Sequence, residues 1–321
     1  MALFDFPLER LEEYVPERTE PADFDQFWAD TLAEARTHDL NPIFEPYDSG
    51  LTAQDVYDVS FAGFDGQRIN AWLLIPKHVQ QPMPCVVEYI GYGGGRGFPI
   101  NHTLVSSAGY ANLVMDTRGQ GSSGARGDTP DAGASGESQY PGFMSRGVNS
   151  PHDHYYRRLF TDAVRAVETA RSHPAIDGRI VVSGGSQGGG ISLAVAGLVD
   201  DLTGVYASQP FLCHYRRAVT ITDNMPYYEL SKFLNAHPDK VERTFETMDY
   251  LDGVNFSARA TAPARFNVGL MDATCPPSTV YAAYNHYAAE KSMDIYKFNG
   301  HDGGGAFGVK AKVEWFHQLL D

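Results

Sequence analysis

The sequence is short of basic residues and of cysteine, and each shortage excludes a class of protein. It has 25 Lys and Arg against 40 Asp and Glu among its 321 residues, so its formal net charge is −15. Proteins that bind nucleic acid or anionic membranes need clustered positive charge, so neither partner is expected. The 3 cysteines show no repeated spacing and no Cys-x-x-Cys pair, which argues against a disulfide framework and a structural zinc site.

Long apolar runs are also missing. No segment approaches the roughly 18 apolar residues of a membrane helix, and residues 1–10 lack the apolar stretch of a signal peptide. These absences, together with an odd number of cysteines without repeated spacing, predict a cytoplasmic location. Apolar residues as a whole are plentiful, 43% of the chain, which is enough to fill a large core.

From about residue 84 onward, short apolar runs alternate with helical patterns. Strands are predicted at 85–90, 111–115, 179–183, 204–207, 264–270 and 294–298, and helices at 161–172, 278–290 and after 308. This alternation predicts an α/β fold with a mostly parallel central sheet that is flanked by helices on both faces.

Two regions fall outside that alternation. An N-terminal extension, residues 1–50, contains a predicted helix at 22–36, and a predicted hairpin of strands 56–61 and 68–75 follows it. Residues 212–258 are too long for a simple crossover and are rich in aromatic and helical residues. We expect them to form a helical insertion over the carboxyl edge of the sheet, where ligands bind in such folds. Both regions are assigned to a single domain, residues 1–321.

A glycine-rich turn carries the first candidate for chemistry. Residues 184–188, Gly-Gly-Ser-Gln-Gly, follow a predicted strand and precede an apolar helical run. In that context Gly-x-Ser-x-Gly is the nucleophile elbow of α/β-hydrolases, where small neighbours let strand and helix approach closely around Ser186. The alternative is an ordinary strand-to-helix turn whose serine only caps the helix.

A nucleophilic serine needs a base, and the base needs an orienting acid. In this fold the acid and then the histidine follow the serine along the chain. Asp272 and His301 each follow a predicted strand, so both fall at the sheet edge that carries Ser186. These three residues are predicted to form a catalytic triad.

Other histidines offer alternatives that the pattern does not favour. His286 and His317 lie in helical runs and are interpreted as packing or surface residues. His152 and His154 flank Asp153 and could suggest a metal, but residues separated by one position project to opposite sides of a strand, and no carboxylate cluster accompanies them. No metal is predicted.

The oxyanion of ester hydrolysis needs two backbone N–H donors. One is predicted to be Gln187, the residue after the nucleophile. The other is predicted to be Tyr92, in the glycine-rich loop that follows the strand at 85–90, and its ring is expected to wall the acyl pocket. A flexible loop is the alternative for residues 91–97; a dinucleotide site is excluded because no Gly-x-Gly-x-x-Gly register fits.

Several segments match the pattern of one known family. They are residues 116–121 (Asp-Thr-Arg-Gly-Gln-Gly), 184–189 (Gly-Gly-Ser-Gln-Gly-Gly) and 270–280 (Leu-Met-Asp-Ala-Thr-Cys-Pro-Pro-Ser-Thr-Val), with further similar stretches at 3–5, 24–28, 140–144 and 210–214. Together they resemble carbohydrate esterase family seven, which contains acetyl xylan esterases that are also cephalosporin C deacetylases. The resemblance covers nearly the whole chain.

The resemblance implies an α/β-hydrolase that needs no cofactor. It implies a serine esterase that removes acetyl groups from short xylo-oligosaccharides and other small acetylated molecules. It also implies a ring-shaped homohexamer whose active sites face an internal cavity.

The resemblance assigns roles to individual residues as well. It implies Ser186, Asp272 and His301 as the triad and Tyr92 and Gln187 as the oxyanion donors. It implies Pro226 beside the acyl group, and it implies that Arg118 and Gln120 are structural near the site. The residues predicted to contact the substrate are Tyr92, Pro226, Phe211 and Thr274.

Two positions depart from the family pattern. Asp302 stands where a glutamate usually follows the histidine, and Thr274 stands where a larger apolar residue is expected near the pocket. The alternatives in function are a general short-chain carboxylesterase, a peptidase of the same fold and a non-catalytic hydrolase-fold binding protein. A peptidase usually carries an N-terminal propeller, for which the residues before 85 leave no room.

Overall fold

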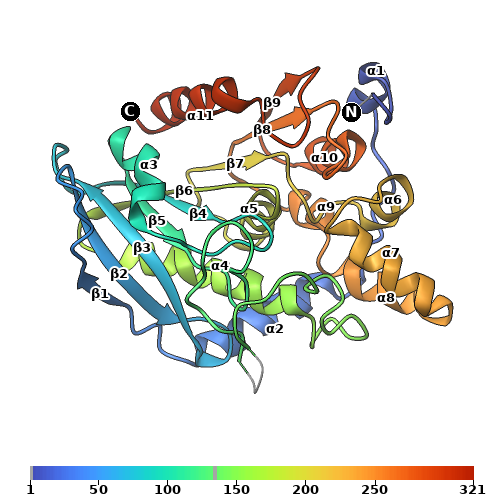
Figure 1. Ribbon diagram of the computed structural model, residues 1–321, viewed down its shortest axis with the longest axis horizontal. Coiled ribbons are helices and arrows are strands. Elements are labelled where there is room, and N and C mark those ends of the chain that lie inside the picture. The colour runs from blue at the N-terminus through green and yellow to red at the C-terminus, as the bar shows by residue number, and fades with distance from the viewer. Residues whose placement is uncertain (1–2, 133–135) are drawn as a thin grey trace.

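One sheet runs through the part of the chain that the computed structural model describes, residues 3–132 and 136–321. It has nine strands in the order β1-β2-β3-β5-β4-β6-β7-β8-β9 (Figure 1). The pairings from β1 to β5 are antiparallel, and those from β5 onward are parallel. The strands are β1 Ile43–Pro46, β2 Gln54–Ala62, β3 Arg68–Pro76, β4 Met83–Tyr89, β5 Ala111–Met115, β6 Ile176–Gly185, β7 Gly204–Ser208, β8 Ala264–Gly269 and β9 Lys291–Tyr296.

Helices cover both faces of this sheet, because alternate residues of its central strands are apolar on both sides. Val86 packs in the cluster that contains Phe316 of α11, whereas its neighbour Val87 belongs to the cluster on the side of α4 and α5. The helices are α1 Leu8–Glu12, α2 Phe24–Arg36, α3 Thr103–Ser107, α4 Tyr155–Ser172, α5 Gln187–Leu198, α6 Tyr215–Ile221, α7 Tyr227–Ala236, α8 Val241–Asp249, α9 Gly253–Ser257, α10 Pro277–His286 and α11 Gly305–Leu320.

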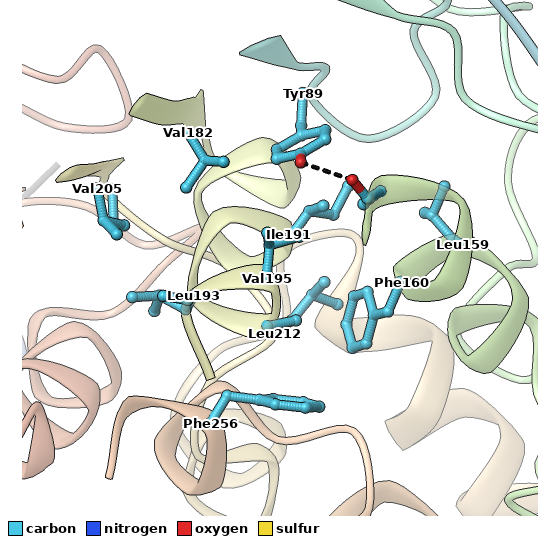
Figure 2. Close-up of a cluster of buried hydrophobic side chains, with 14 of the residues drawn as sticks. Tyr89, Leu159, Phe160, Val182, Ile191, Leu193, Val195, Val205, Leu212 and Phe256 are labelled. Carbon is cyan, nitrogen blue, oxygen red and sulfur yellow. Dashed lines mark hydrogen bonds between the residues drawn. The ribbon is translucent and has the colours of Figure 1, made fainter. Parts of the chain in front are cut away.

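Helix α5 lies in the middle of the larger core. Figure 2 shows Ile191 and Val195 of this helix among side chains from β4, β6 and α4. Burial of each such side chain contributes about 1.5–3 kcal/mol. On the same side of the helix, the Tyr89 hydroxyl donates to the carbonyl of Ala163 in α4 over 2.9 Å. The start of α5, directly after Ser186, is therefore fixed by the core.

The predicted mostly parallel sheet with helices on both faces is confirmed, and several bounds differ from those predicted. Strand β9 begins at Lys291 and ends at Tyr296, so residues 297 and 298 lie beyond the strand rather than in it. Helix α4 begins at Tyr155, six residues before the predicted helix at 161–172. Strand β1 was not predicted, because its four residues, Ile-Phe-Glu-Pro, are too few to show an alternation.

Residues 212–258 fold into helices α6, α7, α8 and α9. Helices α6 to α8 lie at one end of the molecule (Figure 1), while α9 packs against α5 and α10 in the helical layer. The segment before α7 brings Met225 and Pro226 to the same cavity as Ser186. Within the described ranges, no helix combines the length and the apolar composition that a bilayer crossing requires.

Candidate active site

Ser186 occupies the turn between β6 and α5 in a backbone conformation that few residues adopt. Its φ is 56° and its ψ is −118°, a strained combination for any residue with a side chain. The glycines on either side make the turn possible: a Cβ at Gly184 would lie 2.3 Å from the carbonyl carbon of Gly188, and a Cβ at Gly188 would lie 2.1 Å from the oxygen of Tyr89. The strain is therefore held by close backbone packing, as a nucleophile elbow requires.

Asp272 and His301 meet at the carboxyl ends of β8 and β9. Nδ1 of His301 lies 2.7 Å from Oδ2 of Asp272, whose side chain is fully buried. The other carboxylate oxygen accepts the backbone N–H groups of Thr274 at 2.8 Å and Cys275 at 2.9 Å. Because an ionised carboxylate only accepts hydrogen bonds, Nδ1 carries the hydrogen and Nε2 is left as the basic nitrogen.

The cavity in front of Ser186 brings the predicted residues together. It has a volume of about 420 Å³ and is open to the surface. Its lining consists of Ile90, Gly91, Tyr92, Gly94, Ser123, Ala125, Tyr140, Ser186, Met225, Pro226, Thr274 and His301. In the described part of the chain no hydrogen bond joins Ser186 to His301; such bonds are often long in a free enzyme and shorten when substrate binds.

Phe211 is the one predicted substrate contact that does not line the cavity. Its side chain is fully buried, and its ring packs edge-on against Tyr227 with the centroids 4.4 Å apart. The backbone N–H of Phe211 donates to the carbonyl of Ser186 over 2.9 Å. Phe211 therefore supports the serine turn from behind instead of facing the cavity.

Tyr92 lies in a tight turn that leaves its backbone N–H free. The turn is closed by the N–H of Gly94, which donates to the carbonyl of Gly91 over 3.2 Å, and Gly93 has the φ of +81° that the third position of such a turn requires. Among the described residues, neither the N–H of Tyr92 nor that of Gln187 donates a hydrogen bond. Two free donors beside the serine are what an oxyanion needs.

Two glutamine side chains hold this turn at both ends. Gln187 donates from Nε2 to the carbonyl of Ile90 over 3.1 Å, and Oε1 of Gln120 accepts the N–H of Gly93 over 2.6 Å. The two amides also bond to each other, at 2.9 and 3.2 Å. Gln120 was predicted to be structural, and this contact shows what it supports: the turn that carries Tyr92.

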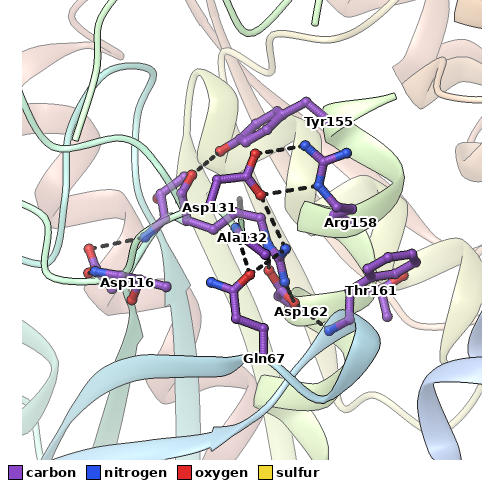
Figure 3. A network of polar contacts seen from close by, with 12 residues as sticks. Gln67, Asp116, Asp131, Ala132, Tyr155, Arg158, Thr161 and Asp162 are labelled. Atoms are coloured by element: carbon purple, nitrogen blue, oxygen red, sulfur yellow. Dashed lines mark hydrogen bonds and ion pairs between the residues drawn. The ribbon is translucent and has the colours of Figure 1, made fainter. Parts of the chain in front are cut away.

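Arg118 belongs to a buried polar network, and Figure 3 shows its acidic partners Asp131 and Asp162. Its guanidinium donates to both carboxylate oxygens of Asp162, at 2.5 and 2.8 Å, and to Asp131 and Gln67. Its side chain is 1% exposed and is not part of the cavity lining. Arg118 therefore ties helix α4 to the loops behind the site and does not reach the substrate position.

Cys275 is a neighbour of the triad that the sequence did not point out. Its Sγ lies within 4.8 Å of a carboxylate oxygen of Asp272 and of a ring nitrogen of His301, the atoms with which these residues could bind a metal. Burial, with the charge of Asp272, raises the pKa of this thiol well above its usual range, whereas a hydrogen bond with Ser186 lowers it. The thiol is therefore protonated, and Asp272 and His301 are bonded to each other, so this trio does not fit a resident metal ion.

The two histidines that had suggested a metal have structural roles. Nδ1 of His154 accepts the N–H of Tyr156 over 3.1 Å and caps helix α4, and its Nε2–H donates to the carbonyl of Met144 over 3.2 Å. Burial lowers the pKa of His154 to about 4, so the ring is neutral. The ring of His152 packs against Phe27 with the centroids 5.0 Å apart.

The departures noted at Asp302 and Thr274 have distinct surroundings. Asp302 accepts hydrogen bonds from Asn299 and from the N–H of Gly304, so its carboxylate shapes its own loop and makes no bond to His301. Thr274 lines the cavity, and its backbone N–H holds Asp272. Of the two, only Thr274 faces the substrate position.

Comparisons with known proteins agree on one family. The family described as Acetyl xylan esterase (AXE1) matches residues 1–319. An acetyl xylan esterase from Paenibacillus sp. R4 has the same fold with a TM-score of 0.90 and 36% identity, covering 98% of this chain and 100% of that one. Acetyl Xylan Esterase 1 from Thermoanaerobacterium sp. JW/SL YS485 gives a TM-score of 0.89 and 30% identity, covering 99% and 100%.

A curated relative is longer than this chain. Acetyl esterase Axe7A from Xylanibacter ruminicola is 29% identical over 290 residues, which is 89% of this chain and 64% of that protein. The chain thus spans about two thirds of its length.

Proposed function

Because this chain belongs to the acetyl xylan esterase (AXE1) family, with an α/β-hydrolase fold, we propose that it is a serine esterase that deacetylates short acetylated xylo-oligosaccharides. Other small acetyl esters, cephalosporin C among them, are included in the proposal. The observation that carries it is the 2.7 Å bond between Asp272 and His301 at the cavity that also contains Ser186. The proposed reaction needs no cofactor.

The proposed reaction begins with proton transfer. Nε2 of His301 takes the proton of Ser186 as Oγ attacks the acetyl carbonyl carbon, and Asp272 stabilises the resulting imidazolium. The N–H groups of Tyr92 and Gln187 donate to the oxyanion. His301 then returns the proton to the sugar oxygen, the C–O bond breaks, and the alcohol leaves while the acetyl group remains on Ser186.

Water completes the cycle. His301 removes a proton from a water molecule, whose oxygen attacks the acetyl carbonyl, and the second oxyanion uses the same two donors. The ester bond to Ser186 breaks, the serine regains its proton from His301, and acetate is released. Each half-reaction uses the same base and the same donors, so loss of either affects both.

The cavity suits a small acyl group and a polar alcohol. Ile90, Met225 and Pro226 offer apolar walls, and no Lys, Arg, Asp or Glu is among the lining residues that the structure describes. The hydroxyl groups of Ser123 and Thr274 stand in the same lining, where a sugar could form hydrogen bonds. A volume of about 420 Å³ is in the range of sites that bind small molecules.

An acyl-length series with the Ser186→Ala variant as the control tests this function. We expect the wild type to hydrolyse acetyl esters far faster than octanoyl esters, to leave amides intact, and to lose activity in Ser186→Ala. Comparable rates on acetyl and octanoyl esters would indicate a general carboxylesterase instead. Cleavage of amides would indicate a peptidase, and no turnover by the wild type would indicate a binding protein.

The proposed assembly is tested separately. We infer a homohexamer from the family resemblance, and light scattering on the purified protein measures its mass directly. A hexamer that deacetylates xylo-oligosaccharides less efficiently as they lengthen supports an enclosed site. A monomer, or full activity on polymeric xylan, contradicts it.

A further inference from the structure

The side chain of Tyr92 ends on a buried carboxylate that belongs to the helical insertion. Its hydroxyl donates to Oε1 of Glu229, in helix α7, over 2.6 Å. That distance is typical of a charge-assisted bond between a hydroxyl and a carboxylate. The Tyr92 oxygen in turn accepts the backbone N–H groups of Gly142 at 3.2 Å and Phe143 at 3.0 Å.

Glu229 is enclosed and fully engaged. It is 9% exposed, and its second oxygen accepts the N–H of Met144 over 3.1 Å. Burial raises the pKa of this carboxyl, and the hydrogen bond from Tyr92 lowers it. A buried carboxylate destabilises the fold unless it is hydrogen-bonded. These contacts therefore favour one arrangement of the Tyr92 loop, residues 142–144 and helix α7.

The bond between Tyr92 and Glu229 also bears on the backbone N–H of Tyr92, because of where Tyr92 lies in its turn. Gln187 holds the carbonyl of Ile90 and Gln120 holds the N–H of Gly93, so the backbone is fixed on both sides of Tyr92. The neighbours Gly91 and Gly93 have no side chains that would restrict the backbone, so these two hydrogen bonds supply the restraint. The N–H of Tyr92 is separated by one bond from the Cα atom that carries the ring. A shift of that Cα atom would therefore move both groups, and the ring is held at its hydroxyl.

We propose that Glu229 is a positioning residue of the oxyanion hole, which acts through the Tyr92 side chain to aim the Tyr92 backbone N–H at the developing oxyanion. The proposal rests on the function proposed above. It makes the insertion part of the catalytic apparatus, because helix α7 supplies the group that orients a donor on the loop after β4. Glu229 itself does not line the cavity.

Two variants at the bond, with a matched control elsewhere, test the proposal. Glu229→Gln keeps the shape and one acceptor but removes the charge, and Tyr92→Phe removes the hydroxyl and keeps the ring. Tyr110→Phe is the control, because its hydroxyl donates to Asp321 over 2.7 Å at the C-terminal end of α11, a second tyrosine–carboxylate bond that lies outside the cavity lining.

The rate constants distinguish positioning from a merely structural role. Complete loss of an oxyanion donor lowers kcat by about 10²–10³-fold, so a misdirected donor is expected to lower it about tenfold in Glu229→Gln and somewhat more in Tyr92→Phe. KM should change little, because the oxyanion forms only in the transition state. Tyr110→Phe should keep the wild-type kcat.

A second readout targets the oxyanion itself. A trifluoromethyl ketone forms a tetrahedral oxyanion adduct on the serine, and its inhibition constant should rise by the same factor as kcat falls. The double variant, Tyr92→Phe with Glu229→Gln, should be no slower than Tyr92→Phe alone, because the two changes act on the same contact. Additive losses would contradict action through Tyr92.

Other outcomes would overturn the proposal without affecting the proposed function. Glu229→Gln and Tyr92→Phe with lowered melting temperatures but wild-type kcat and inhibitor affinity would mean that the bond only stabilises the fold. A rise in KM with constant kcat would place Glu229 in substrate binding. If instead Ser186→Ala retained activity, the esterase mechanism would fail first, whatever the Glu229 variants do.

Discussion

The two halves of the site are held in place by different means. Asp272 and His301 form the acid–base half, which is held by nearby backbone and by one bond between neighbouring strand ends. One carboxylate oxygen accepts backbone N–H groups two and three residues further along, and the other accepts Nδ1–H of His301, beyond the end of the adjacent strand. The oxyanion half is the turn around Tyr92. Side chains from distant segments hold it, among them Gln120 and Gln187.

This difference predicts two patterns of sensitivity. In the acid–base half, one side chain has one chemical task that no neighbour shares, so a single substitution removes that task. In the oxyanion half, several bonds share the task of aiming one N–H group, so a single substitution weakens it and leaves the other bonds in place. The buried ion pair of Arg118 and Asp162, outside the cavity lining, should affect stability far more than rate.

The largest effect on rate is expected at Asp272. Asp272→Asn keeps the shape, but its amide can donate to Nδ1 and so leave the hydrogen on Nε2, where the base must be. The same tautomer change in serine proteases lowers kcat by about 10⁴-fold, and we expect a loss of that order here.

Asp302→Asn is the control for this change. Asp302 follows His301 directly, but its carboxylate accepts hydrogen bonds from Asn299 and Gly304. The kcat of Asp302→Asn should therefore stay close to that of the wild type. Steady-state hydrolysis of an aryl acetate measures both variants. A similar loss in the two variants would mean that the acid–base half is not organised as described.

An intermediate effect is expected at Gln120. Gln120→Leu leaves the N–H of Gly93 without its 2.6 Å acceptor and removes one of the partners of the Gln187 amide. We expect kcat to fall by about 10–100-fold with little change in KM, less than the 10²–10³-fold loss of a whole donor. The control is Gln26→Leu on the exposed side of α2. A loss as large as that of Asp272→Asn would show that the bonds do not share the task.

The smallest effect on rate is expected at Arg118. Arg118→Met leaves Asp162 buried without its cation, which costs about 3–5 kcal/mol in the free energy of unfolding. Arg118 does not line the cavity, so kcat of the folded enzyme should stay near that of the wild type. Urea unfolding measures the first quantity, and steady-state rates divided by the concentration of titrated active sites measure the second.

Arg36→Met provides the matched control for stability. Arg36 pairs with Glu168 at the surface, and an exposed pair contributes at most about 1 kcal/mol. Equal losses of stability in the two variants would contradict the buried role of Arg118. A large fall in kcat with unchanged stability would place Arg118 in the chemistry.

The sequence predicted what depends on order along the chain. The strand-to-helix turn around Ser186, and an acid and then a histidine after later strands, follow from local patterns, and the structure places Asp272 and His301 within hydrogen-bond distance. The parallel sheet was equally predictable from alternating apolar runs. Strand β1 was not, because four residues are too few to show an alternation.

The sequence could not predict contacts that depend on side chains from distant segments. Glu229 reads as an ordinary polar position in an amphipathic helix, and no local pattern indicates that its partner is Tyr92, 137 residues away. Phe211 was predicted to contact the substrate, and only the packing of its ring against Tyr227 shows that it faces the core. These contacts follow from the tertiary fold and not from spacing.

The most direct test of the proposed mechanism is to identify the acetylated residue during turnover. With an aryl acetate as substrate, acylation is fast and the acyl-enzyme should accumulate, so acid quenching followed by peptide mass spectrometry should find one acetyl group on Ser186. The Ser186→Ala variant should show neither this acetyl group nor turnover. Steady hydrolysis with no acetyl group on Ser186, or turnover by Ser186→Ala, would contradict the mechanism.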